Sequence, residues 1–301
     1  MSTHEERLAR ARLSLEGLSV GDSLGGFFEF GRTELQEYWR NTRALPNGEW
    51  RFTDDTNMAL SIYAILRKHH GIDQNALANH FAKHFDRTRG YGLGARKLLM
   101  RLQIGADWRQ VAPYIFSGGS YGNGGAMRVA PLGAYFADDI DSLVENAKLS
   151  AEITHAHPEG IAGAIAVAVA TSIAVNATEK IDYHDFIDGV LEHVPDSLVR
   201  TNIAKGHDVP PETEIWTGVV AVLQNGSGVS AQDTVPLVIW VAATCLDDFE
   251  SAMWKLIDAR GDVDTTCAMV GGIIACFVGQ DGIPQKWIAQ REKLPQWAFE
   301  D

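Results

Sequence analysis

Cysteine is scarce in this sequence, with three residues in a chain of 301. Cys245, Cys267 and Cys276 lie in apolar runs, and their spacing matches no metal-binding pattern. An odd number of cysteines in such positions excludes a disulfide-rich scaffold and predicts reduced thiols in a cytoplasmic protein. A chain of this length can bury a large hydrophobic core without covalent cross-links.

Positive charge is also in short supply. Lysine and arginine number 26 against 39 aspartate and glutamate residues, which gives a net charge of −13. Such a field disfavours non-specific binding to nucleic acid or anionic lipid, so we expect no nucleic-acid partner. An anionic small molecule remains compatible if bound metal or backbone N–H groups make its pocket locally positive.

Long hydrophobic runs are missing as well. The longest, residues 161–175, is rich in alanine and shorter than the ~20 residues needed to cross a bilayer. Residues 1–12 carry several charges, which excludes the pattern of a secretory signal peptide. The sequence therefore predicts no membrane partner.

Alternating strand patterns are rare, whereas the helical period recurs along most of the chain. Met58, Ile62 and Leu66, for example, follow the i, i+4, i+8 spacing of one helix face. Because no repeat, linker or compositional shift marks a boundary, the predicted fold class is all-α, a single compact multi-helix domain over residues 1–301. Helices are expected at residues 5–18, 57–69, 94–104, 212–224, 232–246, 248–259 and 264–279.

Two segments, residues 158–174 and 261–279, are unusually rich in small residues. Small side chains let helix backbones approach one another closely. Both segments are therefore predicted to form central helices.

Two short motifs place paired carboxylates and a hydroxyl at predicted helix starts. Residues 53–56 read Thr-Asp-Asp-Thr, and residues 262–265 read Asp-Val-Asp-Thr. One interpretation is capping, in which Thr53 caps its helix and the aspartates complement the helix dipole. The other is that both sets of side chains point past the helix ends toward a common cation. Glu29 adds a third acidic element, since a glutamate beside two phenylalanines is a poor choice for a solvated face.

The combination favours a metal site. Carboxylate and hydroxyl oxygens without clustered cysteine or histidine suit Mg²⁺ or Mn²⁺ better than Zn²⁺. Five carboxylates around one point would repel one another strongly, and two divalent cations would offset most of that charge. Asp22, in contrast, is interpreted as an ordinary turn residue.

Glycine is concentrated in residues 117–125, where it supplies five of the nine positions. Such a loop is either flexible and exposed or brings its backbone close to a ligand. The backbone N–H groups of this loop would suit a diphosphate, and a helix expected to begin near Gly125 would add the positive end of its dipole. No Gly-Lys-Ser/Thr follows, which excludes a P-loop, and no strand precedes it, which excludes a dinucleotide fingerprint.

Together these pieces resemble the ADP-ribosylglycohydrolase family. The matching motifs are, in order, Gly21-Asp22-Ser23 with Glu29, residues 52–56, residues 122–128, Thr154-His155 and residues 261–265. The resemblance implies an all-α fold, a binuclear Mg²⁺ or Mn²⁺ centre, and hydrolysis of the bond at the anomeric carbon of ADP-ribose. It assigns metal ligation to Thr53, Asp54, Asp55, Asp262, Asp264 and Thr265.

The branch of the family that acts on serine-linked ADP-ribose looks most similar. Residues 89–92 and 119–125 resemble its loops, and Glu29 falls where that branch has a mobile, metal-binding glutamate. The same match implies that Phe116 and Tyr121 stack on the adenine and that His155 contacts the distal ribose. The loop residues it assigns to the substrate are Gly119, Ser120, Gly122 and Asn123, the last three holding the diphosphate and ribose.

The sequence departs from that branch at two points. Val263 stands where threonine is usual, which removes a hydroxyl but no ligand. Residues 155–158, His-Ala-His-Pro, are closer to the branch that acts on arginine-linked ADP-ribose. An arginine-linked hydrolase is therefore the alternative.

The implied reaction passes through an oxocarbenium-like state and needs a carboxylate that accepts a proton from water. Either Glu29 or Asp262 is expected to be that base. The expected substrate is an ADP-ribosylated protein or a small O-acyl-ADP-ribose ester, and a monomer suffices for such a site. Two rival readings are a non-catalytic ADP-ribose binder and a binuclear-metal phosphohydrolase, which would release phosphate.

Three remaining features carry less information. Residues 17–21 fit Gly-x-Ser-x-Gly, but a nucleophile elbow needs a preceding strand, and residues 5–18 indicate a helix. The His-Asp pairs at 184–185 and 207–208 are interpreted as surface groups. The tail, residues 283–301, is expected to be either a packed end or a contact surface.

Overall fold

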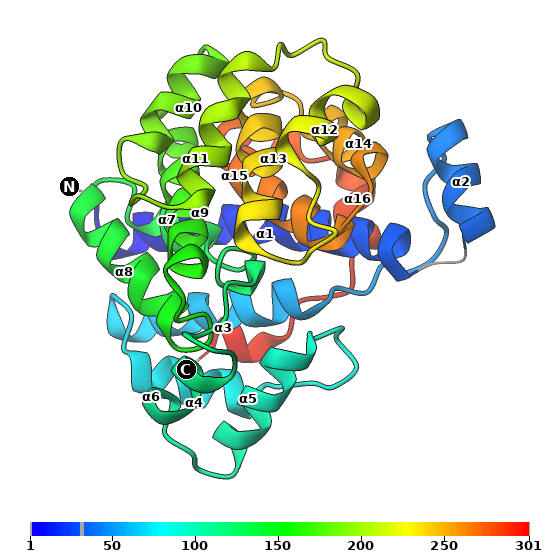
Figure 1. Cartoon of the computed structure of the whole chain (residues 1–301). Coiled ribbons are helices and arrows are strands. Elements are labelled where there is room, and N and C mark those ends of the chain that lie inside the picture. The colour runs from blue at the N-terminus through cyan, green and yellow to red at the C-terminus, as the bar shows by residue number, and fades with distance from the viewer. Residues whose placement is uncertain (1, 31–32, 301) are drawn as a thin grey trace.

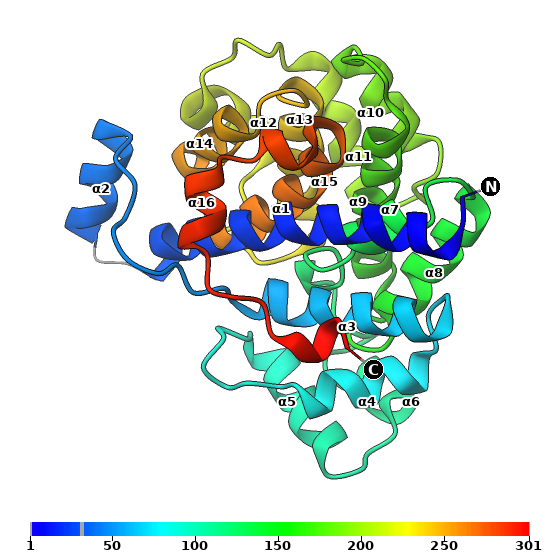
Figure 2. The same cartoon turned by 180° about the vertical axis from the view of Figure 1, so that it is seen from behind.

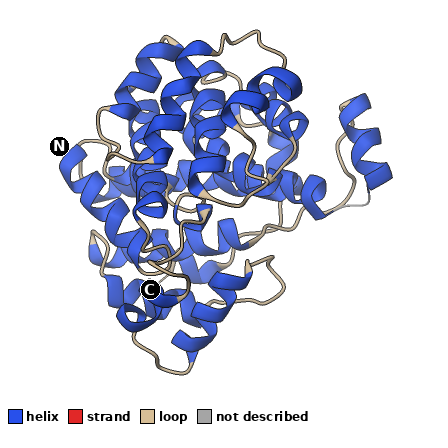
Figure 3. Ribbon diagram, in the orientation of Figure 1, coloured by secondary structure: helices blue, strands red, loops and turns tan. Residues whose placement is uncertain are grey.

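A computed structural model of the chain describes residues 2–30 and 33–300. Over these residues the backbone forms helices joined by loops, and β-type pairing is confined to two isolated bridges (Figure 3). The all-α prediction is therefore confirmed. In chain order the α-helices are α1 His4–Phe30, α2 Thr33–Thr42, α3 Asp54–His69, α4 Gln74–Lys83, α5 Leu93–Gln103, α6 Trp108–Val111, α7 Ala130–Tyr135, α8 Ile140–Glu152, α9 Pro158–Asn176, α10 Tyr183–Leu191, α11 Leu198–Ala204, α12 Val220–Leu223, α13 Ala231–Thr244, α14 Phe249–Ala259, α15 Val263–Gly282 and α16 Gln285–Gln290.

The long helix α1 runs through the middle of the molecule (Figure 1). Helices α9–α15 lie on one side of it, and α3–α6 lie on the other. The start of α3 and the start of α15 both approach the C-terminal half of α1. Helix α2 stands apart, beyond the C-terminal end of α1.

Helices α1 and α15 pack along each other at very short range because α1 presents glycine to α15. Gly17, Gly21 and Gly25 recur every fourth residue and so line one face of α1. A Cβ at Gly21 would lie 2.1 Å from the carbonyl oxygen of Cys267, and one at Gly25 would lie 2.6 Å from the Cα of Asp264. The two backbones are thus closer than any other residue type on this face of α1 would allow.

This packing explains two predictions that were wrong. The first helix does not end at residue 18 but continues to Phe30, and Asp22 lies inside it rather than in a turn. Glycine in a helix interior costs roughly 1 kcal/mol relative to alanine, which is why the sequence suggested an early end. Here the close contact with α15 compensates for that cost.

The two segments rich in small residues form α9 and α15, and both are central and mostly buried, as predicted. By length and composition alone these helices could cross a membrane. However, 72% of the apolar window of each is buried inside the structure, which is typical of core helices in a globular domain.

The C-terminal segment is a packed end. Trp287 is 2% exposed and packs edge-on against Trp50. Trp297 stacks on the ring of His84 with a centroid distance of 3.8 Å. Figure 2 shows this segment running from α16 along the loop before α3 and ending beneath α3.

Replacing Gly21 with alanine is expected to destabilise the fold. The new Cβ would meet the carbonyl oxygen and carbon of Cys267, at 2.1 and 2.7 Å, so α1 and α15 would have to separate. Overpacking of this kind typically costs about 1–3 kcal/mol, which chemical unfolding would measure. Gly92→Ala is the control, because nothing lies within 4 Å of a Cβ at Gly92. Equal losses at the two positions would contradict the packing argument.

Candidate active site

Three helices bring carboxylates to one point inside the molecule. Asp22 lies within α1, Asp55 in the first turn of α3, and Asp264 in the first turn of α15. One oxygen from each lies within 4.8 Å of the other two, and all three side chains are buried. We call these three residues the inner triad.

A second group of three carboxylates shares Asp264 with the inner triad. Glu29, Asp262 and Asp264 also place one oxygen each within 4.8 Å of one another. Glu29 lies at the exposed C-terminal end of α1, and its Oε2 accepts the Val263 N–H at 3.3 Å. We call Glu29, Asp262 and Asp264 the outer triad. Two triads that share a residue are a suitable donor set for two neighbouring cations.

One part of the capping interpretation was wrong, the N-cap at Thr53, whereas the aspartates do lie in the first turns of α3 and α15, where carboxylates complement the helix dipole. Neither Thr53 nor Asp262 makes a side-chain capping hydrogen bond to its own helix, as far as the described residues show. Asp22 instead accepts the N–H groups of Thr53 and Thr56 at 3.0 Å and the hydroxyl proton of Thr56. The Thr53 hydroxyl lies 2.8 Å from both Asp22 Oδ1 and Asp55 Oδ2, so the two carboxylates share its one proton. Helix α3 is therefore capped from α1, and Asp54 and Asp55 are free to face the cluster.

The hydrogen bonds of Asp55 show that the carboxylates of the two triads, together with Asp54 (below, the cluster), lack a positively charged partner. Its Oδ2 lies 2.8 Å from the Thr53 hydroxyl, which can donate to it. Its Oδ1 is buried, and no group in the described part of the chain donates a hydrogen bond to it. Leaving a buried carboxylate oxygen unpaired is costly. A pocket of carboxylate and hydroxyl oxygens suits a hard divalent cation, so these residues fit Mg²⁺ or Mn²⁺.

Burial and mutual repulsion raise the pKa values of the carboxyl groups. Burial raises the pKa of Asp22 to about 6, and burial followed by the charge of Asp22 raises the pKa of Asp54 to about 8. Burial and neighbouring carboxylates hold the pKa values of Asp55 and Asp264 well above the usual range. A bound cation reverses this effect because it favours the ionised forms.

Asp262 is held in place by several groups. The Asn123 amide donates to its Oδ2 at 2.6 Å, and Thr265 also hydrogen bonds to the carboxylate. Its backbone N–H donates to the carbonyl of Asn225 at 3.3 Å. The preceding Gly261 has a φ of 76° and packs against Asn225 so closely that a Cβ would lie 2.1 Å from the carbonyl oxygen. The turn before α15 therefore requires glycine.

The glycine-rich loop packs against protein over much of its length, although Ser117, Gly118 and Tyr121 are exposed. Residues 123–125 are buried. A Cβ at Gly124 would lie 2.6 Å from the His155 ring, and one at Gly119 would lie 2.8 Å from the backbone nitrogen of His157. The expected helix near Gly125 is absent from this described stretch: a 3₁₀ turn covers 123–125, and α7 begins only at Ala130.

A buried arginine, Arg128, is linked to His155 through Thr154. The Arg128 guanidinium is fully buried and donates to the Ser150 carbonyl and the Thr154 hydroxyl, at 2.9 and 2.8 Å. That hydroxyl contacts Nδ1 of His155 at 2.8 Å. The Thr154 hydroxyl accepts from Arg128 and can donate its own proton to Nδ1, an arrangement in which the ring hydrogen lies on Nε2. Burial, and next the charge of Arg128, lowers the pKa of His155 to about 3, so the ring is neutral at pH 7.

The two aromatic residues predicted to stack on adenine are exposed. Phe116 is 50% exposed and Tyr121 is 49% exposed. The ring of Tyr121 meets His157 edge-on with a centroid distance of 5.6 Å, and Phe116 packs near Gly94. About half of each of these two rings is therefore exposed to solvent, where a planar base can stack on it.

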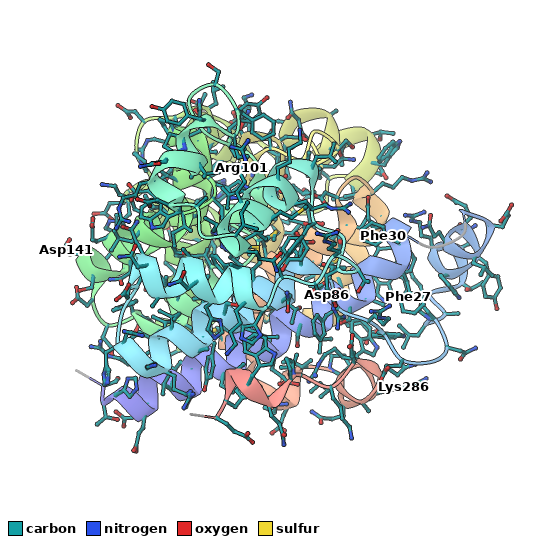
Figure 4. The ribbon with its side chains drawn as sticks, turned by 90° about the horizontal axis from the view of Figure 1, so that it is seen from below. Phe27, Phe30, Asp86, Arg101, Asp141 and Lys286 are labelled. Atoms are coloured by element: carbon teal, nitrogen blue, oxygen red, sulfur yellow. The ribbon has the colours of Figure 1, made fainter. Side chains whose placement is uncertain are left out.

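A pocket of about 430 Å³ adjoins the cluster at Thr53. Its walls combine three phenylalanines with two arginines, a glutamate, two threonines and two glycines; they consist of Gly26, Phe27, Phe30, Glu49, Arg51, Phe52, Thr53, Thr88, Arg89 and Gly90. Figure 4 shows Phe27 and Phe30 at the end of α1 nearest α2. The back of the pocket reaches the cluster, because a Cβ at Gly90 would lie 3.5 Å from Asp54 Oδ1.

Asp22 is central to the inner triad but was not predicted as a site residue from the sequence. The available signal was its setting: an aspartate between glycines spaced four apart, in a segment with helical period. Arg128 and Asn225 were also not identified, since their partners lie on other elements and leave no local pattern. Of the residues predicted to bind metal, Asp55 and Asp264 lie in the inner triad and Glu29, Asp262 and Asp264 in the outer triad. Thr53 hydrogen bonds to Asp55, Thr265 hydrogen bonds to Asp262, and the charge of Asp54 interacts with Asp22 and Asp262.

Comparisons with known proteins agree with this architecture. Human ADP-ribosylhydrolase ARH3 is 29% identical, over 93% of this chain and 88% of the relative. An uncharacterized protein of Archaeoglobus fulgidus is 30% identical, over 90% of this chain and 88% of the relative. A solved structure titled "ADP-ribosylglycohydrolase-related protein complex" superposes with a TM-score of 0.68 at 22% identity and covers 96% of this chain and 94% of its own, which supports the fold.

The family profile described as ADP-ribosylglycohydrolase matches residues 3–300. This match spans nearly the whole chain and includes every residue of the two triads. The chain therefore belongs to the ADP-ribosylglycohydrolase family.

Proposed function

We propose that the chain hydrolyses the glycosidic bond between ADP-ribose and an acceptor with the help of two Mg²⁺ or Mn²⁺ ions. Family membership supports the general activity, hydrolysis of ADP-ribose linkages. The metal-dependent form rests on one observation: two carboxylate triads share Asp264 and leave a buried oxygen of Asp55 without a partner.

The metal ligands in this proposal come from three helices. Those at the start of α3 are Thr53, Asp54 and Asp55; those at the start of α15 are Asp262, Asp264 and Thr265; Glu29 comes from α1. When bound, the two cations would neutralise the carboxylates, orient the ribose hydroxyls and lower the pKa of a water molecule. Asp22 holds the start of α3 through Thr53 and Thr56 and so fixes where those ligands point.

Glu29 fits the role of general base better than Asp262. Asp262 is engaged by the side chains of Asn123 and Thr265. Glu29 accepts one long bond from a backbone N–H and lies at the exposed end of α1, where it can reach a water molecule.

The substrate in this proposal lies between the glycine-rich loop and the two triads. Phe116 and Tyr121 would stack on the adenine, and the segment of Gly119, Ser120, Gly122 and Asn123 would hold the diphosphate and ribose. The neutral His155, with its hydrogen on Nε2, would donate to a ribose oxygen. The similarity of residues 89–92 and 119–125 to the serine-specific branch supports a serine-linked or O-acyl acceptor.

The proposal is tested by measuring free ADP-ribose released from matched serine-linked and arginine-linked peptides, each with Mg²⁺ and with EDTA. We expect release from the serine peptide that requires Mg²⁺. Release from the arginine peptide alone would keep the hydrolase and overturn the serine preference. Release of inorganic phosphate in place of ADP-ribose would indicate a phosphohydrolase, and no release from either peptide or from O-acetyl-ADP-ribose would leave a binder.

The double variant Asp54→Asn/Asp55→Asn is expected to lose both turnover and stabilisation by metal. Wild type should gain about 2.7 kcal/mol for each Mg²⁺ ion bound when Mg²⁺ is present at a hundred times its Kd, and the variant should lose this gain. In EDTA at neutral pH the variant should unfold at a temperature close to that of wild type, because burial and neighbouring carboxylates keep the Asp54 and Asp55 carboxyl groups largely neutral without metal, as the asparagine amides are.

Thermal unfolding with and without Mg²⁺ measures both effects. Asp141→Asn is the control, since Asp141 is exposed and lies at the opposite end of the molecule from Phe30 (Figure 4). Full activity of the double variant would contradict the ligand assignment.

Tyr121→Ala is expected to weaken ADP-ribose binding by about 1–3 kcal/mol, the usual value of stacking on one base. Titration calorimetry with ADP-ribose in Mg²⁺ would measure the loss. Tyr114→Ala serves as the matched control, because Tyr114 is also exposed but is not assigned to the substrate. Unchanged affinity in Tyr121→Ala would remove this residue from the binding site.

A further inference from the structure

The C-terminal segment returns to the residues that precede α3. The Trp50 N–H donates to the Gln290 carbonyl at 2.7 Å, and the Glu292 N–H donates to the Trp50 carbonyl at 2.7 Å. These two bonds frame a parallel bridge between Trp50 and Arg291. Figure 2 shows the segment after α16 running beside this loop. The end of the chain is thereby attached three residues before Thr53.

The side chain of Glu292 forms a bidentate ion pair with Arg89. Its carboxylate oxygens accept from Nη1 and Nη2 of Arg89 at 2.6 and 2.8 Å. The side chains of Arg89 and Glu292 are 12% and 22% exposed, so solvent screens the pair only partly. A paired, partly buried arginine–carboxylate contact of this kind fixes the orientation of the guanidinium.

Arg89 holds the backbone on both sides of Thr53. Its Nη1 donates to the Phe52 carbonyl at 2.9 Å, and its guanidinium lies 3.9 Å from the centre of the Phe52 ring. Its own carbonyl accepts the Asp54 N–H at 2.7 Å, which is one of the donors that a helix start leaves without an internal partner. Asp22 from α1 and Arg89 from the opposite side therefore hold the first turn of α3 between them.

We propose that Arg89 and Glu292 are positioning residues for the metal site, and that the C-terminal segment is part of that site. Neither side chain belongs to a triad. They act by fixing the backbone of residues 52–54, which determines where the Asp54 and Asp55 carboxylates lie before a cation binds. The inference rests on the proposed function, because it assumes that these carboxylates bind metal.

The chain contains a second ion pair that resembles Arg89–Glu292 in geometry and exposure but lies away from the proposed metal ligands. Arg10 and Asp138 also form a two-point contact, at 2.8 and 2.9 Å, with side chains 23% and 19% exposed. That pair joins the N-terminal half of α1 to the turn after α7, and the other partners of Asp138, Ser2 and Arg7, are not proposed ligands. It provides a control in which an equivalent ion pair is removed away from the site.

The test compares Glu292→Ala, Glu292→Gln and Asp138→Ala in the full chain. Mn²⁺ affinity is measured by titration, and hydrogen exchange of residues 52–57 is measured without metal. We expect Glu292→Ala to weaken Mn²⁺ binding about 10–100-fold, the usual effect of losing a group that orients a metal ligand, and to speed exchange at the Asp54 amide. Glu292→Gln should show a smaller loss, since its amide oxygen can still accept one bond. Asp138→Ala should change neither quantity.

Three results would count against the inference, and they can be told apart. If wild type binds Mn²⁺ and Glu292→Ala binds it equally well, with unchanged exchange, the pair only stabilises the fold and the proposed function stands. If wild type does not bind Mn²⁺, both the proposed metal centre and this inference fail. A loss of thermal stability shared by Glu292→Ala and Asp138→Ala, without a difference in Mn²⁺ affinity, would also count against the inference.

Discussion

The close contact between α1 and α15 is the constraint on which the rest of the site depends. Gly21 and Gly25 let the two backbones approach until no Cβ fits between them. That approach places Asp22, in the middle of one helix, beside Asp264, at the start of the other. Any larger residue on this face of α1 would separate the two carboxylates as well as the helices. The glycines therefore determine both the packing of the core and the spacing of the inner triad.

The same contact buries several carboxyl groups close together, and the described side chains supply no cation that hydrogen bonds to them. Burial raises the pKa values of Asp22, Asp54, Asp55 and Asp264, and neighbouring carboxylates raise several of them further. The buried Arg128 favours ionisation of Asp54 but hydrogen bonds to Ser150 and Thr154, not to a carboxylate. A purely structural core would replace such carboxylates with apolar groups. Their presence is understandable if a divalent cation supplies the missing charge.

The sequence predicted those parts of the structure that local patterns encode. Helical periodicity gave the all-α class and the two central helices, and paired acidic motifs indicated where carboxylates would gather. What it did not predict depends on contacts between distant segments. Asp22 looked like a turn residue because four glycines nearby disfavour a helix, and their compensation comes from α15. The helix expected at Gly125 is absent from the described chain because that loop is folded against His155 and Gly160.

Capping shows how these distant contacts make a site possible. In an isolated helix, Thr53 and the following aspartates would satisfy the free N–H groups of the first turn. In this fold Asp22 accepts from Thr53 and Thr56, and the Arg89 carbonyl accepts from Asp54. Because other elements perform the capping, the carboxylates of the first turn are not used for it. A helix start that is capped from outside can therefore direct its own acidic side chains toward a ligand, and this division of roles links α1, the loop at Arg89 and the C-terminal segment to one function.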